Sequence, residues 1–446
     1  MSIEQTRETL RAAWTDMIDT INRARDYVDS PALHAPPPTE QGLAEGHRYL
    51  LGFLFSSIER ACLEDPEFPY FRRAIQPQDK ATIDNADALY LSARIDGARS
   101  YRITGRVADH RHWRGAARAP GPVAPQYVVF EAHSVYAGDT GNLMELAPGG
   151  RVVTGLLDST DLAVDPDGCF EILCAPARPV GHTGNFVATV KDGADTAQYL
   201  IVRSLFGDWA NEVSPELRIV PIGRVGGHPA LVDSDTTAAA VRRVGELVEH
   251  QMRFWNEFYD IVLESNGDKN GDGVTFMPHN ALNEPAAANL ASGGGQSTNV
   301  YSGGVFELDE DEALLVEVNV PVEPAYLGFH LSNVWGESLD YANHVSSLNG
   351  FQAVIGPDGV RRYVIAHRDP GVPNWLDTVG HRTGFLTVRW TYPKPPERMP
   401  TAAVRRIALA DVRDLLPPGT ATVNSEQRAE QIKIRQEHVA RRYRQY

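Results

Sequence analysis

The chain has 446 residues, of which 58 are acidic and 42 basic, so its formal net charge at neutral pH is −16. This length is too great for one ordinary hydrophobic core and suits two domains. The hydrophobic fraction of 42% and charged fraction of 22% exclude a disordered chain. The acidic balance argues against nucleic acid or an anionic membrane as the main partner. We therefore expect a small-molecule ligand or substrate, and we leave open whether the chain forms a homo-oligomer.

We expect neither a signal peptide at the start of this sequence nor a segment that spans a membrane. The sequence begins MSIEQTRETLRAAW, which is charged and amphipathic and lacks the apolar core of a signal peptide. No run of about 18 apolar residues occurs. The three cysteines, Cys62, Cys169 and Cys174, are too few and too irregular for a disulfide framework or a zinc site. We interpret them as buried small side chains and expect a soluble cytoplasmic protein without a cofactor.

Residues 1–80 are expected to form an N-terminal helical segment. Apolar side chains recur there at helical spacing up to Ser30-Pro31, which ends the first helix. The positions are Leu10, Trp14, Met17, Ile21, Ala24 and Val28. A second helix is expected over residues 44–61, with Leu50, Phe53, Leu54 and Ile58 on one face.

Residues 81–230 have the pattern of a first β-sandwich, with short β-branched or aromatic segments between Gly, Pro, Asp and Asn turns. Residues 231–300 begin with a long helix, in which apolar residues from Val241 to Val262 follow the capping sequence DSDTT. A Gly/Ser/Asn-rich loop comes next. Residues 301–395 repeat the strand pattern and indicate a second, jelly-roll domain. Residues 396–446 are expected to form C-terminal helices broken by LLPPGT.

The two strand-rich regions indicate an internal duplication. The segment from Asp87 aligns without gaps on that from Glu312, at an offset of 225 residues that pairs Leu89 with Leu314. DLAVDPDGCFEILCA then matches FQAVIGPDGVRRYVIA, GNF matches PNW, and YLIVRSLFGDW matches FLTVRWTYP, which pairs Arg203 with Arg389. Chance likeness of β-hairpins is the alternative. The expected fold is mainly β with helical additions: two related antiparallel β-sandwich or jelly-roll domains, a long bridging helix and terminal helices.

Several of these segments resemble a known group of proteins. The runs are DPGVPNWLDTVGHRTGFLTVRW, HLSNVWGESLDY, AEGHRYLL, DNADALYLSARI and YRITG. They resemble uncharacterised, largely actinobacterial proteins that carry the domain of unknown function numbered twelve-fourteen, often found beside the domain numbered twelve-fifty-four. The resemblance implies a jelly-roll C-terminal domain and no established activity.

Polar side chains are densest in the second strand-rich region, which we therefore take as the candidate site. A carboxylate and a histidine could transfer a proton there while a tryptophan stacks on a ring. The candidate catalytic residues are His330, Asp340, His344 and Asp377, and the candidate substrate-binding residues are Trp335, Asn374, Trp375 and Arg389. The alternative is structural: Asp and Asn cap turns, Arg389 pairs with a carboxylate, and the tryptophans fill the core.

Three functions agree with this pattern. The first is an enzyme, a hydrolase or lyase, that uses acid/base chemistry on a small neutral molecule, hydroxylated or ring-bearing, such as a sugar, sterol or polyketide-like compound. The second is a protein that binds a small molecule without catalysis. The third is a structural or assembly protein that docks through its terminal helices. Paired Asp and His in a concave pocket would favour the first, and aromatic side chains without such a pair the second.

Metal binding has weak support. His330 and His344 with Glu337 or Asp340 do not have the spacing of a strong metal signature, and we expect no tightly bound zinc or iron.

A second segment is similar to the start of a calcium loop. Asp268, Asn270 and Asp272 alternate as calcium ligands do, but His279 stands where such a loop needs a bidentate glutamate. We expect weak calcium binding at most, and a plain turn is the alternative.

Overall fold

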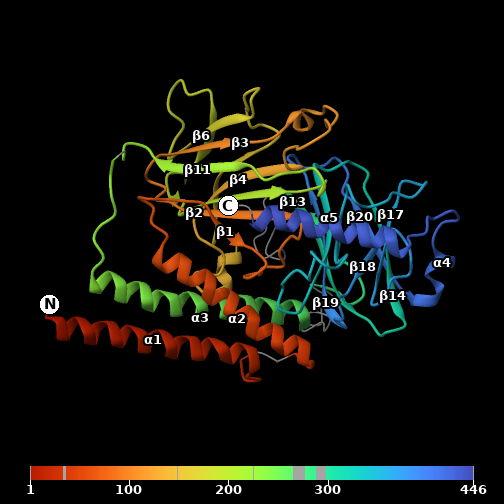
Figure 1. Ribbon diagram of the computed structural model, residues 1–446, viewed down its shortest axis with the longest axis horizontal. Helices are drawn as coiled ribbons and strands as arrows, with labels where there is room; N and C mark the ends of the chain where they lie inside the picture. The colour runs from red at the N-terminus through yellow and green to blue at the C-terminus, as the bar shows by residue number, and fades with distance from the viewer. Residues whose placement is uncertain are drawn as a thin grey trace.

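The computed structural model describes residues 2–33, 37–147, 149–224, 226–264, 277–287 and 298–444. Two β-sandwiches lie side by side, with three helices below the first sandwich and the last helix across the front of both (Figure 1). The expected fold class, mainly β with one long helix and terminal helices, is confirmed. Within the described residues, no helix is both long and apolar enough to cross a membrane.

Three long helices form the lower layer: α1 (Ile3–Asp29), α2 (Glu40–Cys62) and α3 (Ser234–Glu264). The side chain of Asp233 accepts hydrogen bonds from the first backbone N–H groups of α3, as the capping sequence predicted. The apolar stripe of α3, including Met252 and Trp255, is buried against the other two helices and the second sandwich. This buried stripe explains the helical spacing of its apolar residues.

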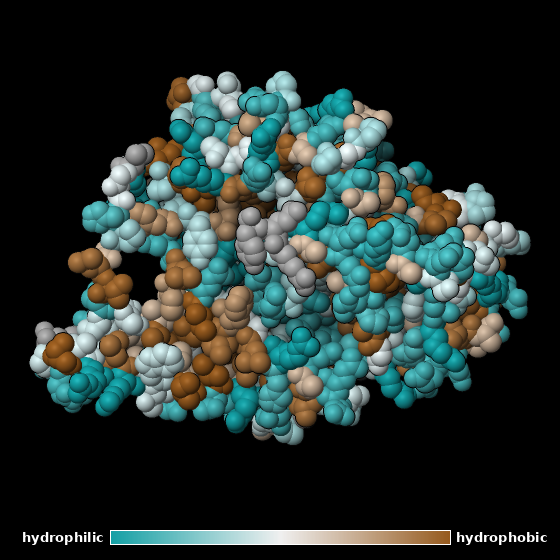
Figure 2. Space-filling view, in the orientation of Figure 1, coloured by the Kyte–Doolittle hydropathy of each residue, from teal (hydrophilic) through white to brown (hydrophobic). Residues whose placement is uncertain are grey.

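The outer face of α2 carries exposed apolar side chains, visible in Figure 2 as a hydrophobic area over this helix. Ile58 and Cys62 are exposed, although the sequence suggested that both are buried. The reason is that α2 packs through the opposite side, where Tyr49 and Phe53 enter the helical core. Of the other cysteines, Cys174 is buried.

The first sandwich has a five-stranded and a four-stranded sheet. The five-stranded sheet has the order β1 (Arg72–Ile75), β2 (Ala88–Arg94), β10 (Tyr199–Leu205), β4 (Tyr127–His133), β5 (Val153–Asp158). The four-stranded sheet has the order β11 (Glu216–Pro221), β3 (Tyr101–Arg106), β6 (Cys169–Ala175), β7 (Asn185–Ala188). A hairpin of β8 (Val190–Lys191) and β9 (Asp195–Thr196) and two short 3-10 helices, η1 (Arg111–Arg114) and η2 (Leu143–Leu146), complete it.

The second sandwich is built in the same way. Its five-stranded sheet has the order β12 (Ala286–Ala287), β13 (Asn299–Glu307), β19 (Thr383–Thr391), β15 (Tyr326–Ser332), β16 (Ser347–Asn349). Its four-stranded sheet has the order β20 (Thr401–Ala408), β14 (Glu312–Asn319), β17 (Arg361–Ala366), β18 (Trp375–Asp377). The chain ends in η4 (Leu409–Asp411), α4 (Val412–Leu415) and α5 (Ser425–Arg444).

Strand order and register therefore match between the sandwiches. In both, the last pair of the four-stranded sheet is parallel, β6 with β7 and β17 with β18. On the central strands, Arg203 is opposite Tyr90 and Arg389 is opposite Tyr301. Arg203 and Arg389 thus occupy equivalent positions, as the sequence comparison suggested.

The ungapped alignment at the offset of 225 residues is wrong by one strand. It pairs β2 with β14, but β2 lies in a five-stranded sheet and β14 in a four-stranded one. Strands that are half-buried share a period of two, so a slip by a whole strand preserves the apolar pattern. The strand order instead pairs β3 with β14 and β4 with β15. His330 accordingly corresponds to Glu131 and not to Gly105.

The first part of the expected C-terminal helical region, residues 396–446, is a strand. Residues Thr401–Ala408 pair along the whole of β14, and Ala402 and Val404 pack against the core of the second sandwich. The period of two in this stretch is the signal that we misread. The second sandwich consequently extends beyond residue 395, and the first begins at Arg72. The last helix, α5, is confirmed.

Candidate functional site

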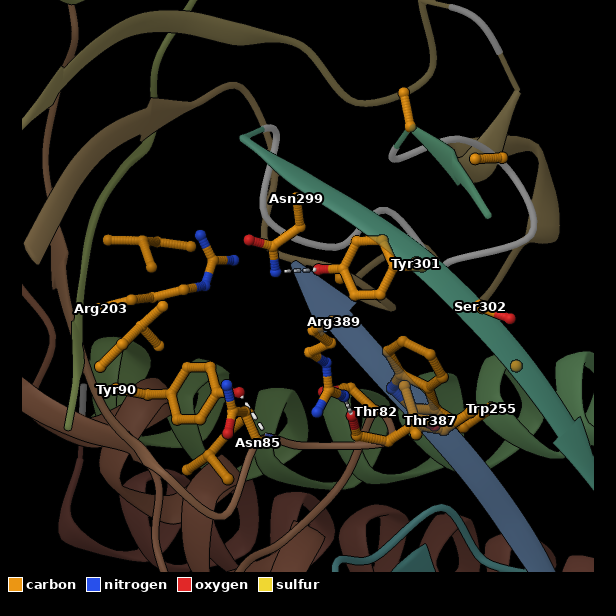
Figure 3. A pocket seen from close by; sticks show the side chains of 18 of the residues that line it. Thr82, Asn85, Tyr90, Arg203, Trp255, Asn299, Tyr301, Ser302, Thr387 and Arg389 are labelled. Atoms are coloured by element: carbon orange, nitrogen blue, oxygen red, sulfur yellow. Dashed lines mark hydrogen bonds between the residues drawn. The ribbon is translucent and has the colours of Figure 1, made fainter. Parts of the chain in front are cut away.

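A cavity lies between the five-stranded sheets of the two sandwiches, and Trp255 of α3 lines it from the helical layer (Figure 3). Its volume is about 140 Å³. An apolar cavity of roughly 150 Å³ holds a benzene molecule, so the space suits a small ligand. Ile75, Ile201 and Leu205 contribute apolar side chains.

Each sandwich contributes one arginine and one tyrosine to the cavity. Arg203 and Tyr90 come from neighbouring strands of the first sandwich, and Arg389 and Tyr301 from the equivalent strands of the second. The backbone N–H of Asn85 donates to the Tyr90 hydroxyl at 2.8 Å. Burial raises the pKa of Tyr90, so the phenol stays protonated and can donate a hydrogen bond.

Two guanidinium groups lie on the side of the first sandwich. Arg203 forms a buried ion pair with Glu131, which raises the pKa of Arg203 although burial opposes it. Arg151 also lines the cavity. Burial, followed by the charge of Arg203, lowers the pKa of Arg151 to about 10.

The third guanidinium, that of Arg389, is 5% exposed and donates to the backbone carbonyl oxygens of Ile83 and Asp84. Among the residues that the structure describes, it forms no ion pair with a carboxylate. Among the described residues that line the cavity, three are arginines and one, the exposed Glu284, is acidic, while the charges of Glu131 and Glu145 act on Arg151 from behind the lining. The lining itself therefore carries more positive than negative charge, which suits a carboxylate or phosphate.

His330, a candidate catalytic residue, is fully buried in a polar cluster beside the cavity. Its Nε2 lies 3.2 Å from the Tyr326 hydroxyl and 3.6 Å from Asp87 Oδ2. Asp87 also accepts from the side chains of Trp209 and Asn349, at 2.8 and 2.9 Å. Burial, followed by the charges of Arg389 and Arg435, lowers the pKa of His330 well below its usual value, so the ring is neutral at neutral pH.

His344 and Asp377 meet, as the acid/base hypothesis required. Nδ1 of His344 lies 2.8 Å from Oδ2 of Asp377, and the side chain of His344 is 40% exposed. Asp340 accepts hydrogen bonds from the backbone N–H groups of Ala342 and Asn343 and so caps the turn that leads to His344. Neither His344, Asp377 nor Asp340 lines the described cavity.

The two candidate tryptophans are part of the packed interior. The indole N–H of Trp335 donates to the carbonyl of Gly42 at 2.7 Å, which fixes α2 against the second sandwich. The indole N–H of Trp375 donates to the carbonyl of Ala366 at 3.0 Å. Both rings are at least nine-tenths buried, so no stacking face is left for a ligand.

Asn374 joins two segments of the second sandwich. Its side chain donates to the carbonyls of Val354 and Arg362 and accepts from the N–H of Val354. The equivalent residue of the first sandwich, Asn185, makes the same three bonds to Ala163 and to the carbonyl of the residue on the neighbouring strand. The pairing of GNF with PNW thus reflects a shared structural role.

Of the eight candidate residues, Arg389 alone lines the cavity, and the structure does not gather the others around one pocket. The sequence analysis did not select Tyr90, Tyr301, Arg203 or Trp255. The available signal for the arginines was the match of YLIVRSLFGDW with FLTVRWTYP, which pairs Arg203 with Arg389. The tyrosines were missed because the alignment was shifted by one strand.

The described ranges contain no group of three or more His, Cys, Asp or Glu that could hold a metal ion. The sequence Asp268–Asp272, considered for calcium, lies outside those ranges. His279, which is described, forms an ion pair with Glu307 at 3.3 Å.

Comparison with known proteins supports the fold. No family model matches the chain, and no curated protein matches it. An uncharacterised protein from Burkholderia cenocepacia has a similar crystal structure, with a TM-score of 0.73 and 27% sequence identity over 91% of this chain and 100% of that one. A protein from Vibrio parahaemolyticus matches at a TM-score of 0.40 and 11% identity, over 86% of this chain and 100% of that one, which is too distant to bear on the fold. The resemblance to the domain numbered twelve-fourteen stays a prediction.

Proposed function

We propose that this protein binds a small organic anion with an apolar or aromatic body in the cavity between its two sandwiches. The carrying observation is that Arg151, Arg203 and Arg389 all line one cavity of small-molecule size. Burying a charge costs several kcal/mol unless it is paired, and Arg389 forms no ion pair with a carboxylate of the described residues, so an anionic ligand would compensate its charge.

The shape and chemistry of the lining favour a ring-bearing ligand. Trp255, Tyr90 and Tyr301 supply aromatic surface on different sides of the space (Figure 3). Aromatic faces and edges pack well against a ligand ring, and guanidinium groups bind carboxylates with directed hydrogen bonds. An aromatic or cyclic carboxylate satisfies both requirements.

Binding without catalysis is the better supported form of this function. Among the described lining residues, the titratable side chains are arginines, tyrosines and Glu284 at the rim. An acid/base enzyme in the second sandwich is the second candidate, because His344 and Asp377 are hydrogen-bonded at 2.8 Å. That candidate predicts that Asp377→Asn abolishes turnover while the melting temperature is nearly unchanged.

The cavity also suggests how the protein arose. We infer an internal duplication, supported by the identical strand orders and by the equivalent arginine and tyrosine positions. The cavity then forms where two copies of one sheet face each other.

Isothermal titration calorimetry with benzoate and its uncharged analogue benzamide tests the proposal. We expect benzoate to bind and benzamide to bind at least about tenfold more weakly, since a tenfold ratio needs only about 1.4 kcal/mol. Arg389→Gln should abolish the preference for benzoate. Arg361→Gln is the matched control, because Arg361 is a buried arginine of the same sandwich that does not line the cavity. Absence of benzoate binding up to about 10 mM, or an unchanged preference in Arg389→Gln, would contradict the proposal.

A further inference from the structure

The two halves of the cavity differ in the residue that lies beside each arginine on the neighbouring strand. Glu131 lies opposite Ile201, two residues before Arg203, and His330 lies opposite Thr387, two residues before Arg389. Because side chains two residues apart on a strand share a face, Glu131 and His330 both lie beside the arginine of their own sandwich.

This difference changes the charge around each arginine. In the first sandwich Glu131 forms an ion pair with Arg203. In the second, the equivalent side chain is the neutral ring of His330. Arg389 donates its described hydrogen bonds to carbonyl oxygens and lies over the Tyr301 ring, 5.8 Å from the ring centroid. Figure 3 shows the Arg203 side chain reaching toward Asn299, whereas the guanidinium of Arg389 lies near Thr82.

The acidic groups nearest to Arg389 are engaged elsewhere. Both carboxylate oxygens of Asp84 accept hydrogen bonds from Ser338, one from the backbone N–H and one from the hydroxyl, at 2.7 and 2.8 Å. Asp87 is held by Tyr326, Trp209 and Asn349. Among the described residues, neither of these carboxylates forms an ion pair with Arg389, so neither neutralises it by direct contact.

We infer that the cavity binds its ligand in one orientation, with a single acidic group at Arg389 and the uncharged ring toward Arg203 and Tyr90. The inference rests on the proposed function and adds to it the orientation and the number of acidic groups. Arg203 already has a bonded carboxylate, and the charges of Glu131 and Glu145 act on Arg151, so the first half attracts an acidic group much less than Arg389 does. The second sandwich has the neutral His330 where the first has the carboxylate of Glu131. This difference leaves Arg389 available to an anion.

His330→Glu tests this inference, with His330→Gln as the matched control of equal length and no charge. A carboxylate at position 330 would give Arg389 the partner that Glu131 gives Arg203. We expect the benzoate affinity of His330→Glu to fall at least about tenfold below that of His330→Gln, with benzamide affinity equal in the two variants. Circular dichroism establishes that both variants are folded. Equal benzoate affinities in the two folded variants would overturn the inference.

Glu131→Gln tests it from the other half without adding a charge beside Asp87. Removal of the Glu131 charge should create a second anion-binding guanidinium, so the affinity for isophthalate, which has two carboxylates, should rise at least about tenfold relative to benzoate. No such rise would also overturn the inference, and this variant decides the question where His330→Glu does not fold. Failure of the unchanged protein to bind benzoate would instead remove the proposed function, and the inference with it.

Discussion

At the scale of single residues, strands β4 and β15 have different residues at equivalent positions. Val129 in the first sandwich corresponds to Gly328 in the second, since each lies directly opposite the cavity arginine. The rings of Tyr326 and His330 pack over Gly328: a methyl group built there would lie 2.0 Å from the Tyr326 hydroxyl and 2.4 Å from His330 Nε2. The glycine therefore makes room for the polar cluster that supports the anion-binding half.

Gly328→Ala should accordingly destabilise the protein. Tyr326 cannot swing away cheaply, because its hydroxyl donates to Asp87 at 2.6 Å and its ring is buried. Overpacking of this kind costs about 1–3 kcal/mol of the free energy of unfolding. Denaturant unfolding measures the loss. Gly350→Ala is the control, because its nearest new contact, Leu327 Cβ, would be at 3.3 Å. Equal stabilities of the two variants would show that the cluster is loosely packed.

At the scale of elements, helix α2 is joined to the second sandwich by a charged pair. His381 Nε2 lies 2.8 Å from Glu45 Oε1, and Asn333 donates to the other carboxylate oxygen at 3.1 Å. Burial alone would lower the pKa of His381, but the hydrogen bond and charge of Glu45 outweigh it and raise that pKa. Burial alone would raise the pKa of Glu45, but the hydrogen bond to His381 and its charge lower it.

The pair should make the docking of α2 depend on pH. The raised pKa of His381 gives stability that is complete below about pH 6.5 and is lost as pH rises through the folded-state value. The lowered pKa of Glu45 gives stability that is present above about pH 4.3 and lost in acid. The pair therefore contributes most between these values.

We expect Glu45→Gln to reduce the free energy of unfolding more at about pH 6 than at about pH 9, where His381 is neutral. Denaturant titration at the two pH values measures this difference. Glu40→Gln, in the exposed first turn of the same helix, is the control and should show the same small effect at both. A Glu45→Gln effect that does not change with pH would mean that His381 is uncharged in the folded protein.

At the scale of the whole molecule, much of the architecture could be predicted from periodicity. The helical spacing from Val241 to Val262 and the strand segments around Arg203 and Arg389 lie where the sequence indicated. The site could not be predicted in this way, because the cavity joins positions more than 180 residues apart whose proximity depends on how two sheets face each other. Polar side chains in the second sandwich also have structural roles: Asn374 joins two segments, and Asp340 caps a turn.

The last helix explains how the two sandwiches are held as one body. At its start, Arg428 forms an ion pair with Asp369 of the second sandwich at 3.0 Å. At its end, Arg442 donates to the carbonyls of Ala86 and Ala88 in the first, at 2.8 and 3.0 Å. Its buried side chains contact both sandwiches of the same chain.

Removal of α5, residues 425–446, should therefore uncouple the sandwiches. In differential scanning calorimetry we expect one transition for the whole chain and two resolved transitions, or a single broadened one, for the shortened chain. Removal of residues 1–30 is the control. It deletes α1, which packs chiefly on α3 and α2, and should lower the melting temperature while leaving one sharp transition.

Because the cavity lies between the sandwiches, the chain without α5 should also lose benzoate binding before either sandwich unfolds. A single sharp transition with unchanged benzoate affinity after removal of α5 would show that α3 and the facing sheets suffice to hold the cavity together.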